Sequence, residues 1–311
     1  MKVTWCSMGK FLTDPACIKQ RVYINIPQWN NAGFTGKGLT IFHDDVDLNS
    51  SHSQCCVDIL KTILPDAKIL SGRIDYSSDN SIVSSCIVNC YETKENLPFE
   101  EFIVKNDVSL INNSTSGGRD NNNSAIAVYM RSMIKKYNLI GTGSYGNYGE
   151  VPTNKFQGAF IMVSGVDNDM TDYGVSGKDC DFSMFMGFQD GTSFSAPFLL
   201  GMIGLYRSKY GKITQNEVYN LLKSNCQDLG TVGKDEQWGW GLPKMADVTK
   251  KYITMTIGSN DMYVDGIKVV MDTAPVIDKF GRTLVPIRKP METLGHKVDW
   301  IADEKKVCIY E

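Results

Sequence analysis

Three short stretches of the sequence carry side chains that could do chemistry together. The first, HDDVDLNSSHSQCC, contains two adjacent carboxylates and a histidine; the second, SYGNYG, contains an asparagine between glycines; the third, GTSFSAP, is a serine-rich turn. The side chains concerned are Asp44, Asp45, His52, Asn147 and Ser193. A serine hydroxyl becomes a useful nucleophile when a neighbouring base removes its proton. A hydroxyl, an imidazole and a carboxylate could therefore perform acyl transfer if the fold brings them together.

The serine-rich turn alone also fits a purely structural role. Thr192, Ser193 or Ser195 could cap a helix that begins here, because side-chain hydroxyls accept hydrogen bonds from free backbone N–H groups. Pro197 would then stand in the first turn, where proline is tolerated. The local string leaves both roles open, and the rest of the chain must decide between them.

Apolar runs alternate with helical patterns along the first 250 residues. Strands are expected near 38–46 and 158–167, and strands that run into a loop at 107–118 and 139–147. Helices are expected near 124–138, 198–211 and 214–225, and a helix followed by a strand at 57–70. This alternation predicts an α/β fold, a doubly wound and mostly parallel sheet with helices on both faces. Active sites of such sheets gather at the carboxyl ends of strands, where the three stretches fall.

The pattern changes near residue 250. Short alternating strands follow, with an Asp265-Gly266 hairpin turn in MYVDGIKVVM, a strand and short helix in RTLVPIRKPMETLG, and a closing hairpin in HKVDWIADEKKVCIYE. We therefore expect two domains, 1–250 and 251–311. The second is a small α+β domain near the lower size limit for independent folding.

Composition excludes several classes of partner. The 311 residues have a net charge of −3 and 42% hydrophobic content, which favours neither a nucleic-acid nor a membrane-surface partner. No run approaches the ~18 apolar residues of a membrane span, and the start lacks the apolar core of a signal peptide. Nine scattered cysteines fit reduced thiols in the cytoplasm better than a disulfide framework. Cys86 and Cys90 have no second pair at zinc spacing, so no metal is expected.

Taken together, the three stretches resemble the subtilisin-like serine protease family over roughly residues 20–250. The order Asp, His, Ser along the chain is that of the family. GTSFSAPFLLG is similar to its nucleophile motif, GNYG to its glycine-flanked oxyanion asparagine, and LINNSTSGG to the segment that holds an extended substrate. The resemblance implies a subtilisin-like fold and these catalytic residues: Asp45, His52, Asn147 and Ser193. It implies these substrate-binding residues: Ser114, Thr115, Ser116, Gly117 and Tyr145.

Two departures from the family pattern affect the site. Counting from GKG without a gap selects Asp45 as the triad acid, whereas a shift by one selects Asp44, and the Asp-Asp pair then resembles the kexin branch. We expect Asp45 and keep Asp44 as the alternative. His52 is followed by Ser53 where the family has Gly-Thr. His43 falls inside the predicted strand and is expected to pack beside the site.

The resemblance implies an endopeptidase that hydrolyses peptide bonds through an acyl-enzyme intermediate. The peptide or protein substrate would lie as an added strand, and the base would first accept the serine proton and then donate it to the leaving amine. This chemistry needs no cofactor. Two alternatives stay open: a catalytically dead pseudoprotease that binds a peptide or protein partner, suggested by the altered histidine and aspartate motifs, and an esterase.

The C-terminal domain resembles the copper amine oxidase N-terminal-like domain of bacterial proteins. GRTLVPIRKPMETLG and the following HKVDW carry this resemblance. His296 alone cannot make a copper site. We expect residues 251–311 to dock the chain to a protein or to the cell wall.

Overall fold

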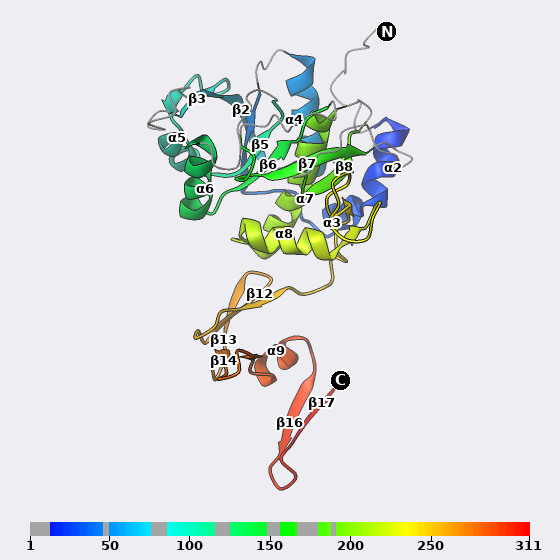
Figure 1. Cartoon of the computed structure of the whole chain (residues 1–311), viewed down its shortest axis with the longest axis vertical. Helices are drawn as coiled ribbons and strands as arrows, with labels where there is room; N and C mark the ends of the chain where they lie inside the picture. Colours follow the sequence, from blue (N-terminus) through cyan, green and yellow to red (C-terminus); the bar gives the residue numbers. More distant parts are fainter. Residues whose placement is uncertain are drawn as a thin grey trace. The chain divides into compact units, whose positions relative to one another are not determined.

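The computed structural model describes residues 13–45, 50–75, 86–115, 125–147, 156–166, 180–187 and 191–311 (Figure 1). These residues divide into two compact units. The first contains the described residues up to Ser208 together with Ile213–Val248, and the second contains Lys209–Lys212 together with Thr249–Glu311. Those predicted functional residues that the structure describes fall in the first unit.

An eight-stranded sheet of order β4-β3-β2-β1-β5-β6-β7-β8 forms the centre of the first unit. The neighbours from β2 to β8 pair in parallel, while β3 and β4 extend one edge in antiparallel fashion. The parallel strands are β1 (Thr40–Asp44), β2 (Lys68–Asp75), β5 (Val108–Asn113), β6 (Ile140–Ser144), β7 (Ile161–Val166) and β8 (Phe182–Phe185). The antiparallel strands are β3 (Ile87–Cys90) and β4 (Asn96–Pro98). The predicted α/β class with a mostly parallel sheet is confirmed.

The chain order reverses direction across the sheet between β1 and β5. From β1 the chain first adds β2 on one side and then β5 to β8 on the other. Such a switch point leaves a crevice outside the carboxyl ends of the two strands, where α/β proteins bind ligands. Asp45 directly follows β1 and Ser114 directly follows β5.

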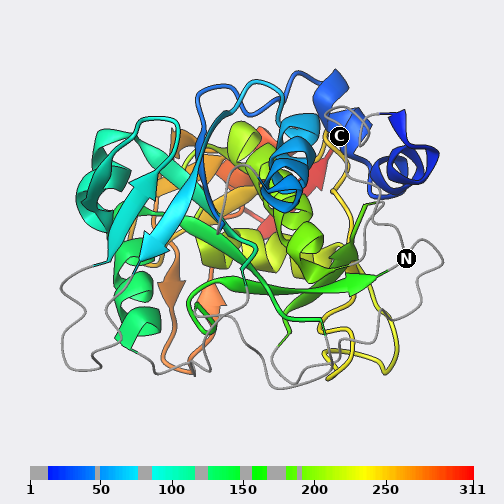
Figure 2. The ribbon, with the colours of Figure 1, turned by 90° about the horizontal axis from the view of Figure 1, so that it is seen from above.

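Helices connect these strands and bury the sheet. They are α2 (Pro15–Tyr23), α3 (Ile26–Asn31), α4 (Ser51–Ile63), α5 (Phe99–Lys105), α6 (Ala125–Tyr137), α7 (Thr192–Tyr210) and α8 (Gln215–Ser224). α5 lies beside β3, β4 and β5 (Figures 1 and 2). Strands β1 and β7 are buried along their whole length, as expected for strands covered on both faces.

One face of the sheet is packed by a large apolar cluster. Phe42 of β1 and Ile111 of β5 join Phe99 and Phe102 of α5 and Met130 of α6 in it. Helix α7 packs on the opposite face. The hydroxyl of Thr142 in β6 donates a hydrogen bond to the carbonyl of Ala196 in α7 at 3.0 Å.

The helix that begins at the serine-rich turn starts earlier than its apolar run. α7 begins at Thr192 and contains Pro197 in its interior, so proline stands in the second turn rather than in the first. α8 begins at the predicted capping box, in which Thr214 and Glu217 satisfy each other's backbone N–H groups. Sequence patterning missed α2, α3, α5, β3 and β4, and it interpreted β8 only as core.

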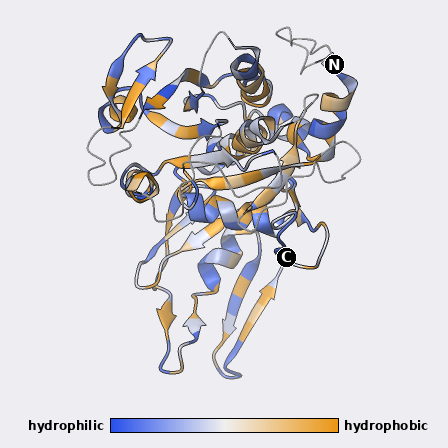
Figure 3. Ribbon diagram, turned by 45° about the horizontal axis from the view of Figure 1, so that its top comes forward, coloured by the Kyte–Doolittle hydropathy of each residue, from blue (hydrophilic) through white to orange (hydrophobic). Residues whose placement is uncertain are grey.

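The second unit consists of small antiparallel sheets and one short helix. The sheets are β11 (Ile253–Met255) with β12 (Asp261–Val264) and β13 (Ile267–Val270), β14 (Val276–Ile277) with β15 (Thr283–Leu284), and β16 (Lys297–Ile301) with β17 (Lys306–Tyr310); the helix is α9 (Arg288–Thr293). Asp265 and Gly266 have φ of 50° and 79° in the predicted hairpin turn. The buried apolar cluster is small, centred on Met262, Val264 and Met271. Hydrophobic and hydrophilic residues alternate along these strands (Figure 3).

Helix α7 approaches the end of α4 closely enough to require glycine. A Cβ atom added to Gly201 would lie 2.7 Å from Cδ1 and 3.0 Å from Cβ of Ile63. Alanine normally favours a helix over glycine by about 1 kcal/mol, but overpacking a core costs about 1–3 kcal/mol. We expect Gly201→Ala to lower the free energy of unfolding by about 1–2 kcal/mol in urea denaturation.

The matched control is Ser132→Ala on the exposed face of α6, which should stay within about 0.5 kcal/mol of the wild type. A Gly201→Ala variant more stable than the wild type would contradict the close packing of α7 on α4.

Candidate active site

The register between β1 and β5 decides which polar side chains meet. It sets His43 opposite Asn112 and Asp44 opposite Asn113. Successive side chains of a strand point to opposite faces of the sheet, so the two pairs lie on opposite faces. Nδ2 of Asn112 donates to Nδ1 of His43 at 2.9 Å, and Nδ2 of Asn113 donates to Oδ2 of Asp44 at 2.7 Å.

The carboxylate of Asp44 is committed to holding strands together. Its second oxygen, Oδ1, accepts the backbone N–H of Ile74 in β2 at 2.8 Å. Asp44 is 1% exposed, and its side chain lies on the same face of the sheet as that of Asn113. Of the two adjacent aspartates, Asp44 is therefore turned away from His52.

Asp45 is the aspartate that meets His52. Oδ2 of Asp45 lies 2.8 Å from Nδ1 of His52. α4 begins after Ser50, whose hydroxyl accepts the backbone N–H of Ser53, and this cap places His52 in the first turn. Because an ionised carboxylate only accepts hydrogen bonds, Nδ1 of His52 carries the proton and Nε2 is left as a base. The His52 side chain is 37% exposed and the Asp45 side chain 4%.

The environment of Asp45 favours its ionised form. Burial by itself raises the pKa of this carboxyl group, but hydrogen bonds from His43 and His52 and their nearby charges outweigh that effect. The net result holds the pKa of Asp45 well below its usual range. The carboxylate can therefore orient His52 and stabilise its imidazolium form throughout the neutral pH range.

Ser193 lies in the first turn of α7 beside Ser114, which follows β5. The Ser193 hydroxyl donates to the Ser114 carbonyl at 3.0 Å, and the Ser114 hydroxyl donates to the Ser193 carbonyl at 2.7 Å. Within the part of the chain that the structure describes, no hydrogen bond joins Ser193 to His52. The contact between His52 and Asp45 is therefore formed. A contact between Ser193 and His52 would require the Ser193 hydroxyl to rotate away from the Ser114 carbonyl.

Asn147 follows β6 and lies against the start of α7. Its Oδ1 accepts the backbone N–H of Thr192 at 2.9 Å and lies 3.0 Å from the Thr192 hydroxyl. With Oδ1 engaged, the amide Nδ2 is the group that Asn147 can offer as a donor. Gly191, with a φ of 141°, supplies the left-handed backbone that leads into this turn.

The predicted substrate-binding residues divide into three groups. Ser114 is 2% exposed at the carboxyl end of β5, and the Thr115 hydroxyl accepts from Asn113 at 2.9 Å. Ser116 and Gly117 lie outside the described residues. Tyr145 is 1% exposed and belongs to the large apolar cluster. Tyr145 follows β6, and its ring is buried in the cluster that also contains Phe156 and Phe160. Its role in substrate binding stays a prediction.

Sequence reasoning expected His43 beside the site but missed the buried polar side chains of Asn112 and Thr142 that lie with it. His43, Asn112 and Thr142 are each 0% exposed, and Thr142 Oγ1 lies 3.2 Å from Asn112 Oδ1. The available signal was a polar residue in the middle of an apolar strand, repeated in three neighbouring strands. Buried polar groups of this kind are expensive unless they are hydrogen-bonded to each other.

His43, Asp45 and Cys56 form the cluster in the described residues that could hold a metal ion. Their ligand atoms lie within 4.8 Å of one another. Burial and the neighbouring Asp45 raise the pKa of the Cys56 thiol well above its usual value, whereas a metal binds the thiolate. The thiol instead lies 3.4 Å from the Ser193 carbonyl and 3.5 Å from the Ser114 hydroxyl. The cluster is better interpreted as part of the hydrogen-bond network.

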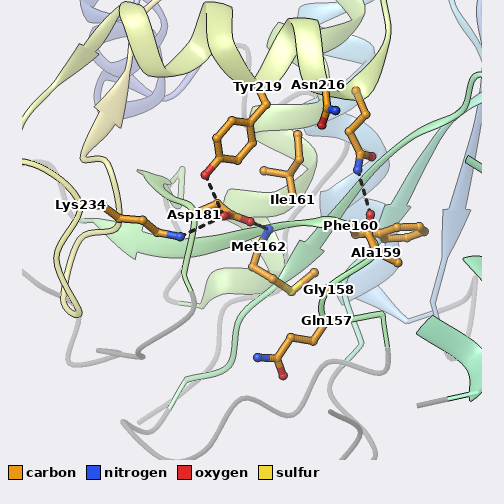
Figure 4. Close-up of a pocket in the computed structure, with 11 residues that line it drawn as sticks. Gln157, Gly158, Ala159, Phe160, Ile161, Met162, Asp181, Asn216, Tyr219 and Lys234 are labelled. Atoms are coloured by element: carbon orange, nitrogen blue, oxygen red, sulfur yellow. Dashed lines mark hydrogen bonds and ion pairs between the residues drawn. The ribbon is translucent and has the colours of Figure 1, made fainter. Parts of the chain in front are cut away.

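A pocket of about 300 Å³ lies at the amino ends of strands β7 and β8 (Figure 4). Ile161 and Met162 at the amino end of β7 line it, as does Asp181 just before β8. Asp181 accepts hydrogen bonds from Tyr219 at 3.0 Å and Lys234 at 3.2 Å. The carboxylate of Asp181 is therefore satisfied by neighbours within this pocket.

Comparison with known proteins finds a family match for the C-terminal residues and a structural likeness over most of the chain. The copper amine oxidase N-terminal domain family matches residues 241–309. The serine protease MycP1 from Mycobacterium smegmatis has a similar structure, with a TM-score of 0.53 and 14% sequence identity over 76% of this chain and 85% of MycP1. At this identity the likeness shows a shared fold.

Two curated relatives match short segments of the chain. The autotransporter lipoprotein NalP of Neisseria meningitidis is 42% identical over 52 residues, which cover 17% of this chain and 5% of NalP. An extracellular serine protease of Serratia marcescens is 28% identical over 83 residues, which cover 26% of this chain and 8% of that protease. The chain therefore spans only a small part of the length of either relative. Among the described residues, no helix combines the length and apolar character that crossing a bilayer requires.

The lowered pKa of Asp45 predicts a pH-dependent contribution to stability. The pKa of Asp45 in the folded protein lies below its value in the unfolded chain, which is about 3.9 for aspartate. Between these two pKa values the unfolded chain binds more protons than the folded protein. The stabilisation is therefore fully present above the unfolded pKa and is lost as pH falls toward the folded pKa. Asp45→Asn should be less stable than the wild type at pH 6, and the difference should shrink below about pH 4. Urea denaturation of both proteins from pH 3 to pH 7 measures it.

Gln54→Ala, a neutral change at an exposed position of α4, is the control and should differ from the wild type by the same amount at every pH. A pH-independent difference for Asp45→Asn would show that the ionised carboxylate is not stabilised in the folded protein.

Proposed function

We propose that the chain is a subtilisin-like serine endopeptidase. It would hydrolyse peptide bonds through Ser193, His52 and Asp45 and an acyl-enzyme intermediate. The observation that carries the proposal is the 2.8 Å contact between Asp45 and Nδ1 of His52, placed at the switch point of the sheet next to Ser193 and Asn147. The serine protease MycP1, which shares the fold, is consistent with this assignment.

The first step would exchange one hydrogen bond for another. The Ser193 hydroxyl leaves the Ser114 carbonyl, to which it donates at 3.0 Å, and turns to Nε2 of His52. His52 takes the proton while Ser193 Oγ forms a bond to the carbonyl carbon of the peptide. The peptide C–N bond then breaks as His52 returns the proton to the leaving amine. Water, deprotonated by the same imidazole, hydrolyses the acyl-enzyme.

The developing oxyanion would be held from two sides. Asn147 offers Nδ2, because its Oδ1 is engaged by Thr192. The start of α7 offers the backbone N–H of Ser193, which belongs to a helix terminus with a favourable dipole. Donors fixed in this way need no reorganisation when charge appears on the substrate oxygen.

The substrate would be a peptide or protein segment in extended form. Ser114 and Thr115 continue directly from β5 at the carboxyl edge of the sheet, and a strand placed there would be held by main-chain hydrogen bonds. No cofactor takes part in the proposed reaction. Docking through residues 251–311 and a cytoplasmic location stay predictions.

A second candidate function is peptide binding without cleavage. The observation that favours it is the engaged hydroxyl of Ser193, which donates to Ser114 instead of His52. Free enzymes often close their catalytic hydrogen bonds only when substrate is bound, so this geometry ranks the binding protein second. Hydrolysis of esters would use the same residues and would differ from peptide hydrolysis only in the leaving group of the substrate.

Reaction with a fluorophosphonate separates the two candidates. Intact-protein mass spectrometry should show one adduct on the wild type, because an activated serine attacks phosphorus as it attacks a carbonyl. Ser193→Ala and His52→Ala should show none over the same time. His296→Ala, a histidine change in the second unit, is the control and should label like the wild type. Folded wild-type protein that stays unlabelled would refute the peptidase and leave the binding protein.

The oxyanion role of Asn147 has its own kinetic signature. Asn147→Ala should lower kcat by about 100–1,000-fold with little change in KM, the loss typical for such a donor in a subtilisin. A quenched fluorescent peptide cleaved by the wild type serves as substrate. Asn216→Ala, at an exposed position of α8, should keep the wild-type kcat. A raised KM with an unchanged kcat would instead place Asn147 in ground-state binding.

A further inference from the structure

Asp45 lies between two imidazoles. Oδ2 of Asp45 is 2.8 Å from Nδ1 of His52 and 3.3 Å from Nε2 of His43. The two histidines come from different elements, α4 and β1. The first contact belongs to the proposed Ser-His-Asp set, and nothing in that reaction requires the second.

The proton position on His43 follows from Asn112. An amide nitrogen donates and cannot accept, so Nδ1 of His43 must be the unprotonated nitrogen in its 2.9 Å hydrogen bond with Nδ2 of Asn112. Asn112 is itself oriented, because the Ser114 hydroxyl donates its one proton to the Ser193 carbonyl and must therefore accept a hydrogen bond from Nδ2 of Asn112. The neutral imidazole then carries its proton on Nε2, directed toward Asp45. Nε2 of His43 is buried and forms no aligned hydrogen bond, so its 3.3 Å approach to Oδ2 of Asp45 is an electrostatic contact between an N–H group and a carboxylate.

The same asparagine also reaches the nucleophile's side of the site. Nδ2 of Asn112 donates to the Ser114 hydroxyl at 2.7 Å, and that hydroxyl donates to the carbonyl of Ser193 at 2.7 Å. His43 and Asn112 are fully buried. A buried polar chain is costly unless every member is satisfied, so its presence calls for a reason beyond packing.

We propose that His43 is a positioning residue for the proposed reaction: its Nε2–H, fixed by Asn112, holds the Asp45 carboxylate in the orientation that receives His52. The inference rests on the proposed function. The titratable groups that face Asp45 are His43 on its own strand and His52 and Cys56 on α4. Asn112 on β5 is neutral, and Asp44 is turned to the other face of the sheet.

Removing the Nε2–H has two separable consequences. The carboxylate loses a constraint, so fewer molecules hold His52 correctly and the maximal rate falls. The negative charge of Asp45 is also no longer shared with His43, so it acts more strongly on His52 and the acid limb of the rate profile moves to higher pH. A residue that merely supports the fold would reduce the active fraction without moving that limb.

The test measures the rate constant of fluorophosphonate labelling from pH 5 to pH 9. His43→Leu should lower the plateau roughly ten- to a hundredfold, as for the loss of a polar contact with a charged group, and should move the acid limb to higher pH. His43→Gln places an amide N–H near the position of Nε2 and should restore most of both effects. Ile41→Val, a buried change on the same strand, controls for loosened packing and should leave the limb unmoved.

A limb that stays in place in His43→Leu, or a His43→Gln variant as impaired as His43→Leu, would overturn the proposal. Nitrogen-15 NMR of the histidine rings provides a readout that does not need catalysis. It should find the proton of His43 on Nε2 in the wild type. A proton on Nδ1 would overturn the proposal even if the protein proves not to be a peptidase, whereas unlabelled wild type with the Nε2 proton would refute only the peptidase.

Discussion

The parallel pairing of β1 with β5 is the constraint on which the whole site depends. Its register joins His43 to Asn112 on one face of the sheet and Asp44 to Asn113 on the other. A slip of one residue would send every side chain of β1 to the opposite face. Asp44 would then point toward α4 and Asp45 away from it. The choice between two adjacent aspartates is thus made by strand pairing, before any contact with His52.

The helices that carry His52 and Ser193 pack against each other at a distance from the candidate site. α4 begins near His52 and α7 begins near Ser193, both at the carboxyl edge of the sheet. Toward their other ends Gly201 and Gly204 of α7 leave room for Ile63 and Leu64. Since the two helices can hardly shift along each other without a clash there, the spacing of His52 and Ser193 follows from apolar packing about two turns or more away.

How much the sequence could predict depends on whether the cause was local. The parallel sheet, the Thr214 cap and the Asp265-Gly266 turn follow from periodicity and short-range hydrogen bonding, and all three are present. The edge strands β3 and β4 are three or four residues long, too short for a period to show. The ring of Tyr145 lies in the core because of packing by segments distant in the chain, which no local pattern encodes.

The same limit applies inside the candidate site. Motif spacing suggested that Asp45 and His52 belong together, and the structure places them 2.8 Å apart. The direction of the Ser193 hydroxyl could not be predicted, because it depends on a carbonyl of Ser114, 79 residues away. His43 was expected beside the site, but its link to Asn112 needs the register of two strands. Residue types and order come from the sequence, whereas hydrogen-bond partners come from tertiary pairing.

The hydrogen bond between Ser193 and the Ser114 carbonyl connects substrate binding to the proposed chemistry. Ser114 directly follows β5, at the carboxyl ends of the strands where an extended peptide would add, so a peptide N–H would compete for that carbonyl. Exchanging one neutral hydrogen bond for another changes the free energy little. The freed hydroxyl could then donate to Nε2 of His52, since Nδ1 of His52 already contacts Asp45. On this argument the resting position of Ser193 is compatible with catalysis, because the group that displaces it is the substrate itself.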